Sequence, residues 1–136
     1  MKTILRVSLF IFLTTSFISC NNKQPSKTVT KYGEISVIVP ADFFEKSKNQ
    51  IIVDIRTPQE FADGHIEGAI NLNVFDKAFI TKIAEFDKTK PIFMYCRSGN
   101  RTSSASKKIA NLGFEKVYDL QGGIKNWAKN NQKIVK

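Results

Sequence analysis

The chain has 136 residues, of which 42% are hydrophobic, and a formal net charge of +9 at pH 7. This length fits one domain, since compact domains usually contain about 100–200 residues, and the apolar content excludes disorder over most of the chain. A basic chain can bind nucleic acid, anionic lipid or anionic substrates. Because the sequence carries no nucleic-acid-binding motif and begins like an exported protein, no nucleic-acid partner is expected.

Residues 1–19 are predicted to be a signal peptide that is not part of the folded domain. Lys2 and Arg6 form a short positive stretch, and a nearly unbroken apolar run follows over residues 7–17. The run is too short for a bilayer span of about 20 residues and has the length of a signal-peptide core, about 7–15 residues. A buried helix is the alternative, but the polar residues that follow disfavour it. Removing Lys2 and Arg6 lowers the net charge from +9 to +7.

The end of this segment, Phe17-Ile18-Ser19-Cys20, resembles a bacterial lipobox. The resemblance implies that Cys20 becomes the lipidated first residue of the mature protein and anchors it to a membrane; plain secretory cleavage is the alternative. Residues 20–31 are expected to be a polar tether, because they are mostly polar and include Pro25. We therefore expect a cell-envelope lipoprotein that faces the periplasm from the inner or the outer membrane.

The remaining residues, 32–136, are predicted to form a single α/β domain. Apolar runs rich in β-branched and aromatic residues predict strands over residues 35–39, 51–55, 69–72, 92–95 and 117–120. Helices are predicted over residues 42–48, 58–63, 75–86 and 101–112, with a last helix from residue 123. Strands that alternate with helices are typical of a parallel sheet, here of about five strands, with helices on both faces.

Several helix ends carry specific signals. Thr57 is a good N-cap, Pro58 fits the first helical position, and Glu60 completes a capping box. Gly113 is placed to stop the helix that ends at Leu112. The last helix is expected to bury its tryptophan and to expose a basic stripe, which consists of Lys125, Lys129 and Lys133.

Cys96 is the predicted catalytic residue. With Cys20 assigned to the lipid, Cys96 has no intrachain disulfide partner, so this thiol is buried and inert, pairs with another chain, or reacts. It follows a predicted strand and precedes a helix, and ligands of open α/β sheets bind at such strand ends. Loop amides, the helix N-terminus and the charges of Arg97 and Arg101 favour the reactive thiolate, while Gly99 lets the loop curl.

Other catalytic schemes have little support. His65 is the only histidine, and a lone histidine cannot be assigned as the base that a papain-like Cys–His pair requires. One histidine and one free cysteine are also too few for a metal site. No metal and no cofactor are therefore expected.

Residues from about 34 to 130 resemble a single rhodanese-like domain. The resemblance is carried by Asp54-Ile55-Arg56-Thr57-Pro58-Gln59-Glu60-Phe61, by Gly64-His65-Ile66-Glu67-Gly68-Ala69-Ile70-Asn71-Leu72, by Tyr95-Cys96-Arg97-Ser98-Gly99-Asn100-Arg101, and by Leu120-Gln121-Gly122-Gly123-Ile124 with Trp127. It implies a sulfurtransferase in which Cys96 takes a sulfur atom from a donor, either thiosulfate or a persulfide. Cys96 then carries this sulfur as its own persulfide and passes it to a thiol or cyanide.

The resemblance also assigns roles to other residues. The active-site loop that binds the donor would consist of Arg97, Ser98, Gly99, Asn100 and Arg101. Asp54 and Arg56 would form an ion pair that braces this loop and shapes the pocket. His65 and Trp127 match positions that are usually structural.

Two alternatives to this enzyme stay open. The related dual-specificity phosphatases have a Cys-x5-Arg loop, which is wide enough for phosphate, whereas Cys96 and Arg101 form the shorter Cys-x4-Arg loop of the sulfur-handling members. Phosphatase or arsenate reductase activity is therefore the weaker expectation. The second alternative is a sulfur-delivery or docking module at the membrane surface that does not catalyse repeated turnover of a substrate. A monomer is expected.

Overall fold

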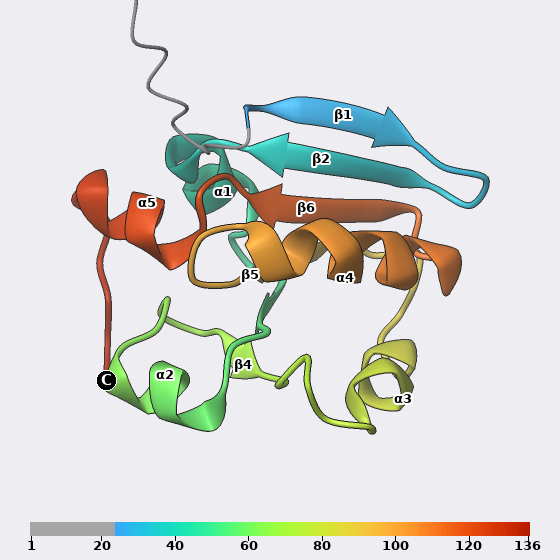
Figure 1. Ribbon diagram of the computed structural model, residues 1–136. Helices are drawn as coiled ribbons and strands as arrows, with labels where there is room; N and C mark the ends of the chain where they lie inside the picture. Colours follow the sequence, from blue (N-terminus) through green and yellow to red (C-terminus); the bar gives the residue numbers. More distant parts are fainter. Residues whose placement is uncertain (1–23) are drawn as a thin grey trace, which may run out of the picture.

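The computed structural model describes residues 24–136, which form one six-stranded sheet covered by helices (Figure 1). The signal peptide, the lipidation of Cys20 and the start of the tether lie outside the described residues. The strands, in the spatial order β1-β2-β6-β5-β3-β4, are β1 (Ser26–Val29), β2 (Glu34–Ile38), β6 (Lys116–Leu120), β5 (Ile92–Tyr95), β3 (Ile51–Asp54) and β4 (Ile70–Asn71). The helices are α1 (Pro40–Lys46), α2 (Pro58–Asp63), α3 (Phe79–Ala84), α4 (Asn100–Asn111) and α5 (Gly123–Lys129).

The predicted α/β architecture is confirmed. Strands β2, β6, β5, β3 and β4 pair in parallel, which gives the five parallel strands that the sequence predicts. Among residues 24–136, none of the helices has the length and apolar character needed to cross a membrane.

One element was not predicted, because β1 lies within the expected tether. Ser26–Val29 pairs antiparallel with β2, with Ser26 opposite Val37, and its four side chains are all exposed. Backbone hydrogen bonds and the ion pair of Lys27 with Glu34, at 2.6 Å, hold this edge strand, so its side chains show no apolar pattern. The tether prediction is therefore wrong from Ser26 onward, and the folded domain begins there instead of at residue 32.

Two hydrophobic cores lie on opposite faces of the sheet. One core packs α3 and α4 against the sheet through residues such as Phe79, Ile83 and Ile109. The other packs α1 and α5 against the opposite face, where Phe43 meets Trp127 with ring centroids 6.0 Å apart. Figure 1 shows α4 in front of the sheet and α1 behind it. The prediction of helices on both faces is thus confirmed.

The helix signals around Thr57 are confirmed, whereas other helix boundaries differ from prediction. Thr57 and Glu60 form the capping box that begins α2. Helix α1 begins and ends two residues earlier than predicted, at Pro40 and Lys46. Helix α3 is shorter than predicted, because the Asn73 side chain accepts a hydrogen bond from the Phe75 amide at 3.1 Å and holds a turn there. Helix α5 ends at Lys129, so Lys133 lies beyond the helix, and the basic stripe does not continue to it.

Candidate active site

Cys96 lies at the edge of the sheet where the parallel strands end, which we call the carboxyl edge. It directly follows β5, and the residue is 1% exposed. The backbone amide of Gly99 donates a hydrogen bond to the Cys96 Sγ at 3.1 Å. Gly99 has a φ of +92° and is the N-cap of α4, which has 12 residues. The N-terminal end of α4 and the Gly99 amide therefore face the sulfur, as expected from the sequence.

Thr102 is a second contact of the sulfur that sequence reasoning missed. Its Oγ1 lies 3.8 Å from the Cys96 Sγ and donates a hydrogen bond to the Gly99 carbonyl at 3.0 Å. Thr102 is fully buried in the first turn of α4. It thus fixes the turn that carries the Gly99 amide.

The Cys96 loop is also held from the other side, by the first turn of α5. The amides of Ile124 and Lys125 donate hydrogen bonds to the carbonyls of Cys96 and Arg97, at 2.9 and 3.2 Å. Gly123 lies so close that a Cβ there would be 2.4 Å from the Cys96 carbonyl oxygen. Only glycine therefore permits this approach, and it explains why the sequence has Gly122-Gly123 after β6.

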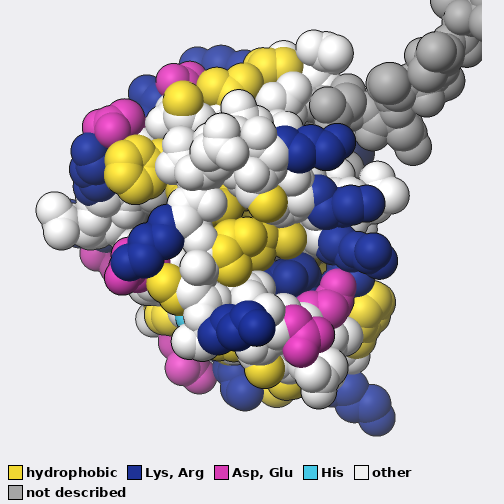
Figure 2. All heavy atoms as spheres, turned by 90° about the vertical axis from the view of Figure 1, so that its left-hand side faces the viewer, with side chains coloured by type: hydrophobic (Ala, Val, Ile, Leu, Met, Phe, Trp, Pro, Cys, Tyr) yellow, Lys and Arg dark blue, Asp and Glu magenta, His cyan; other side chains and the backbone are white. Residues whose placement is uncertain are grey.

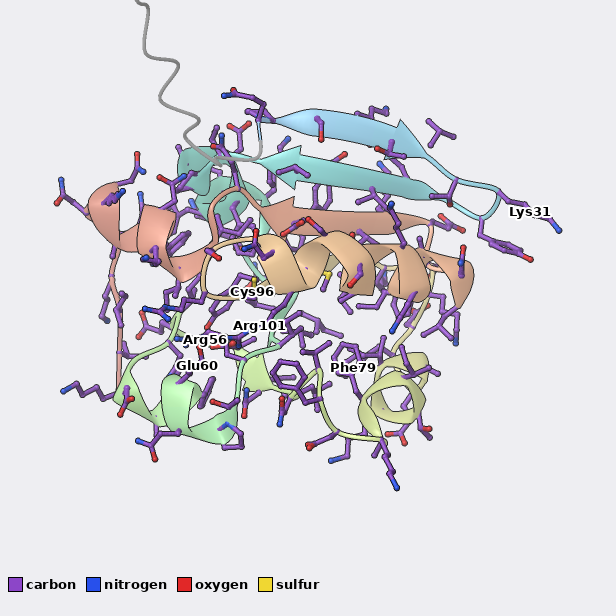
Figure 3. The ribbon with its side chains drawn as sticks, in the orientation of Figure 1. Lys31, Arg56, Glu60, Phe79, Cys96 and Arg101 are labelled. Atoms are coloured by element: carbon purple, nitrogen blue, oxygen red, sulfur yellow. The ribbon has the colours of Figure 1, made fainter. Side chains whose placement is uncertain are left out.

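Arg101 is not a free cation beside the sulfur. Its guanidinium forms two hydrogen bonds with the Glu60 carboxylate, at 2.7 and 2.9 Å. These bonds lower the pKa of Glu60 to about 2 and raise the pKa of Arg101. Arg101 therefore ties α4 to α2, and Glu60, which the sequence identified only as a capping residue, is part of the site. Figure 3 shows Cys96, Arg101 and Glu60 in one cluster.

Asp54 and Arg56 form the predicted ion pair, and both are buried. The Arg56 Nη2 lies 2.6 Å from Asp54 Oδ2 and also donates to the Gly64 carbonyl at 2.7 Å. Burial alone would lower the pKa of Arg56, but the hydrogen bonds with Asp54 outweigh it and raise that pKa. The Arg56 guanidinium also lies over the Tyr95 ring, 5.6 Å from its centroid. The pair thus supports the pocket wall and the strand end that leads into the Cys96 loop.

A cavity of about 470 Å³ opens beside the Cys96 loop. The basic side chains of Arg56, Arg97 and Lys125 contribute to its lining, as does the apolar Ile124. Figure 2 shows this face of the molecule, where hydrophobic side chains lie in a hollow with Lys and Arg side chains around it. Of the predicted loop residues, Arg97 lines the cavity, whereas Ser98, Gly99, Asn100 and Arg101 do not. The buried Cys96 is not part of the lining either, and its neighbour Arg97 marks where the cavity meets the loop.

No metal-binding arrangement accompanies this site. Within residues 24–136, His, Cys, Asp and Glu side chains form no group of three or more that could hold a metal ion. His65 stacks on Phe61, with ring centroids 3.8 Å apart, and its Nδ1 lies 3.1 Å from the Phe61 carbonyl oxygen. The described site therefore offers a single thiol, a set of amide donors and a cavity lined by basic side chains together with the carboxylates of Glu60 and Asp63.

Residues 41–130 match the family of rhodanese-like domains. The chain belongs to this family. The thiosulfate sulfurtransferase GlpE of Pseudomonas putida is 38% identical over 97 residues, which cover 70% of this chain and 86% of the relative. A sulfurtransferase of Allochromatium vinosum is 35% identical over 89 residues, or 65% of this chain and 81% of that one.

A solved structure agrees with this membership. The rhodanese-related protein of Thermoplasma volcanium superposes with a TM-score of 0.61 at 28% identity, and the match covers 73% of this chain and 96% of that chain. The resemblance noted in the sequence is thus confirmed, and this rhodanese-like protein has sulfurtransferases among its relatives. Their existence supports a sulfurtransferase activity here.

Proposed function

We propose that this rhodanese-like protein is an exported, membrane-anchored sulfurtransferase that carries sulfur as a persulfide on Cys96. The hydrogen bond from the Gly99 amide to the Cys96 Sγ, at 3.1 Å, is the observation on which the proposal rests. An amide donor at a helix N-terminus stabilises a thiolate and, after transfer, a persulfide anion. The sulfurtransferases among the relatives support the same reaction class.

In the first step the Cys96 thiolate attacks the outer sulfur of thiosulfate or of a persulfide. A bond forms between the Sγ and that sulfur, the donor's own sulfur–sulfur bond breaks, and sulfite or a thiolate leaves with the electron pair. In the second step a thiol or cyanide attacks the outer sulfur of the Cys96 persulfide, and the Cys96 thiolate is regenerated. Arg97 and Lys125, which line the cavity, are placed to attract anionic donors and to offset the charge of the leaving group.

Replacing the nucleophile tests this proposal. Cys96→Ser should abolish thiocyanate formation from thiosulfate and cyanide, because serine cannot form the persulfide. In the wild-type protein, exposure to thiosulfate should add about 32 Da, the mass of one sulfur atom, at Cys96. Turnover retained in Cys96→Ser would refute covalent catalysis. A Ser104→Ala control, at an exposed position of α4 outside the Cys96 loop, should still form the adduct.

The same measurements separate the enzyme from the sulfur-delivery or docking alternatives. An adduct on Cys96 with negligible multiple turnover would favour a delivery module. No adduct with thiosulfate or with an organic persulfide would favour a docking domain. The enzyme proposal expects both the adduct and repeated turnover, with ping-pong kinetics.

The membrane part of the proposal depends on Cys20. The apolar run of residues 7–17 and the sequence that ends at Cys20 support export and lipidation into the cell envelope. Mass spectrometry of the mature N-terminus should find an acylated Cys20. A Cys20→Ala variant should appear in the soluble fraction, and an unmodified Cys20 in the wild-type protein would refute the anchor.

A further inference from the structure

The last residues of the chain close one side of the cavity. Residues 132–136, which we call the C-terminal strap, lie beyond the range that matches the family, residues 41–130. The amide of His65 donates to the Val135 carbonyl at 2.8 Å, and the Val135 amide donates back to the His65 carbonyl at 2.9 Å. The Trp127 indole donates to the Lys133 carbonyl at 2.8 Å. The strap is thus fixed to both α5 and the segment that follows α2.

This attachment places Ile134 in the cavity wall. Ile134 lines the cavity together with Ile124 and Ala128. It also packs directly on Gly64, where an added Cβ would lie 2.9 Å from the Ile134 Cγ2. Because Gly64 is in turn bound by Arg56 through its carbonyl, Ile134 rests on a rigid part of the site. It gives the cavity an apolar side that does not come from the Cys96 loop.

The cavity also has a cationic side. Arg97 and Lys125 both contribute to its lining and are exposed. Among the residues that the structure describes, no ion pair within 4.0 Å involves either of them. Their charges are therefore available to a ligand. Two carboxylates on α2 also line the cavity: Glu60 is paired with Arg101, and Asp63 accepts a hydrogen bond from Gln59. An anionic group would therefore lie on the Arg97 and Lys125 side, away from Asp63. The α5 backbone holds them near each other, since the Lys125 amide donates to the Arg97 carbonyl at 3.2 Å.

The size of the cavity exceeds what the simplest substrates need. A volume of about 470 Å³ is within the range of about 300–1,000 Å³ typical of sites for drug-sized ligands. Thiosulfate and cyanide would fill only a small part of it. A ligand that used the whole cavity would combine an anionic group with an aliphatic body.

We propose that Ile134 is a specificity-determining residue and that the sulfur acceptor is an aliphatic thiol with a terminal anionic group. This inference rests on the proposed function. The acceptor thiol loses its proton to solvent, and its thiolate attacks the outer sulfur of the Cys96 persulfide. A new sulfur–sulfur bond forms on the acceptor, the bond to the Cys96 Sγ breaks, and the electron pair stays on Cys96. The aliphatic body of the acceptor lies against Ile134, and its anionic group pairs with Lys125 or Arg97.

A series of mercaptocarboxylates of increasing chain length tests the inference, with thiosulfate as the donor. In the full-length protein, kcat/KM relative to that for cyanide should rise up to about fourfold per added methylene, the gain for burying one methylene group. In Ile134→Asn, kcat/KM should increase much less with each added methylene. Ile70→Asn is the matched control, since Ile70 is 44% exposed, like Ile134 at 41%, but does not line the cavity; it should keep the rise.

A second comparison tests the cationic side. Lys125→Gln should reduce the preference for a mercaptocarboxylate over the mercaptoalcohol of the same length by at least about threefold, whereas Lys129→Gln, on the same helix, should not. The inference is overturned if kcat/KM does not rise with chain length in the wild-type protein, or if it rises equally in Ile134→Asn, while the wild-type protein still turns over thiosulfate and cyanide. Absence of thiosulfate–cyanide turnover in the wild-type protein instead refutes the proposed function, and this inference with it.

Discussion

Two charged residues beside the Cys96 loop neutralise each other, and this decides how the loop attracts anions. Arg101 forms a bidentate ion pair with Glu60, with hydrogen bonds of 2.7 and 2.9 Å. Its guanidinium donates two hydrogen bonds in that pair, which joins α4 to α2. Arg97 and Lys125 are the cations that remain available at the cavity. The role of Arg101 is therefore to hold the loop, more than to bind the donor.

The Glu60–Arg101 pair predicts how stability depends on pH. The pKa of Glu60 falls from 4.5 to about 2 on folding, so the pair stabilises the fold above pH 4.5, and this contribution is lost as pH falls toward 2. Glu60→Gln should lower the free energy of unfolding by roughly 1–2 kcal/mol at pH 7, since both side chains are partly exposed and solvent screens them. Urea unfolding at pH 7 and at pH 3 measures the effect.

The difference between wild type and Glu60→Gln should shrink at pH 3. Glu45→Gln is the matched control, because it removes a carboxylate from an exposed pair with Lys48; its effect on unfolding should be small at both pH values. An equal difference at both pH values would show that the Glu60 carboxylate does not contribute through its charge.

At the scale of single residues, the sequence pointed to Cys96 and to amide donors around its sulfur, but not to the side-chain contacts that hold its loop. Cys96, the glycine of its loop and the Asp54–Arg56 pair follow from local pattern and from family resemblance. The Glu60–Arg101 pair joins residues 41 positions apart, and no local signal reports such a contact. Ile134 was missed for the same reason, since only the fold brings the C-terminal strap to Gly64.

Between elements, the contact that matters most is that of α5 with the Cys96 loop. Gly123 has a φ of +61° and lies against the backbone of Cys96 and Arg97. Gly123→Ala would strain the backbone and push the loop away, because the added Cβ would lie 2.4 Å from the Cys96 carbonyl oxygen. A misplacement of about 1 Å can cost about a hundredfold in rate. We expect kcat/KM for thiosulfate and cyanide to fall at least about tenfold.

Gly68→Ala separates backbone strain from the displacement of the loop. Gly68 also has a positive φ, +80°, but a Cβ there would meet nothing within 4 Å. Both variants should lose about 1–2 kcal/mol of stability from the left-handed backbone, whereas only Gly123→Ala should lose activity. Wild-type kinetics in Gly123→Ala would show that α5 does not position the loop.

The accuracy of the element predictions follows from burial. Strands β3 and β5 are apolar runs buried in the sheet, and helix α4 has Gly113 as a clear stop, so the sequence placed all three. Strand β1 escaped prediction because all its side chains are exposed. Helix α3 was predicted too long because Phe75 continues the helical spacing of apolar residues, yet it is 69% exposed in the turn held by Asn73.

For the whole molecule, the position of β1 determines where a membrane anchor would attach. Ser26 is opposite Val37, near the end of β2. Since β2 runs parallel to β5, the start of β1 lies at the carboxyl edge, the same edge as Cys96. The hairpin that contains Lys31 lies at the opposite end of the sheet (Figure 3). An anchor at Cys20 would therefore hold the active-site end of the domain toward the bilayer.

The short linker makes this orientation testable. Residues 21–25 separate Cys20 from β1, a stretch that spans at most about 20 Å when fully extended. In the lipidated Cys96→Ser protein, a donor fluorophore on Lys129→Cys, at the end of α5, should transfer energy efficiently to acceptor lipids in a vesicle. The same fluorophore on Lys31→Cys should transfer less, because the sheet holds it farther from the bilayer.

The two labelled variants lose the same charge, so their difference reports distance and not the attraction of lysine to anionic lipid, which is about 1 kcal/mol per residue. Repeating the measurement on neutral and on anionic vesicles separates the orientation imposed by the tether from the attraction of the basic surface to anionic lipid. The tether alone predicts the same ranking on both. Equal transfer from positions 31 and 129 on neutral vesicles would mean that the domain tumbles freely on its linker, and the active site would then have no preferred approach to the membrane.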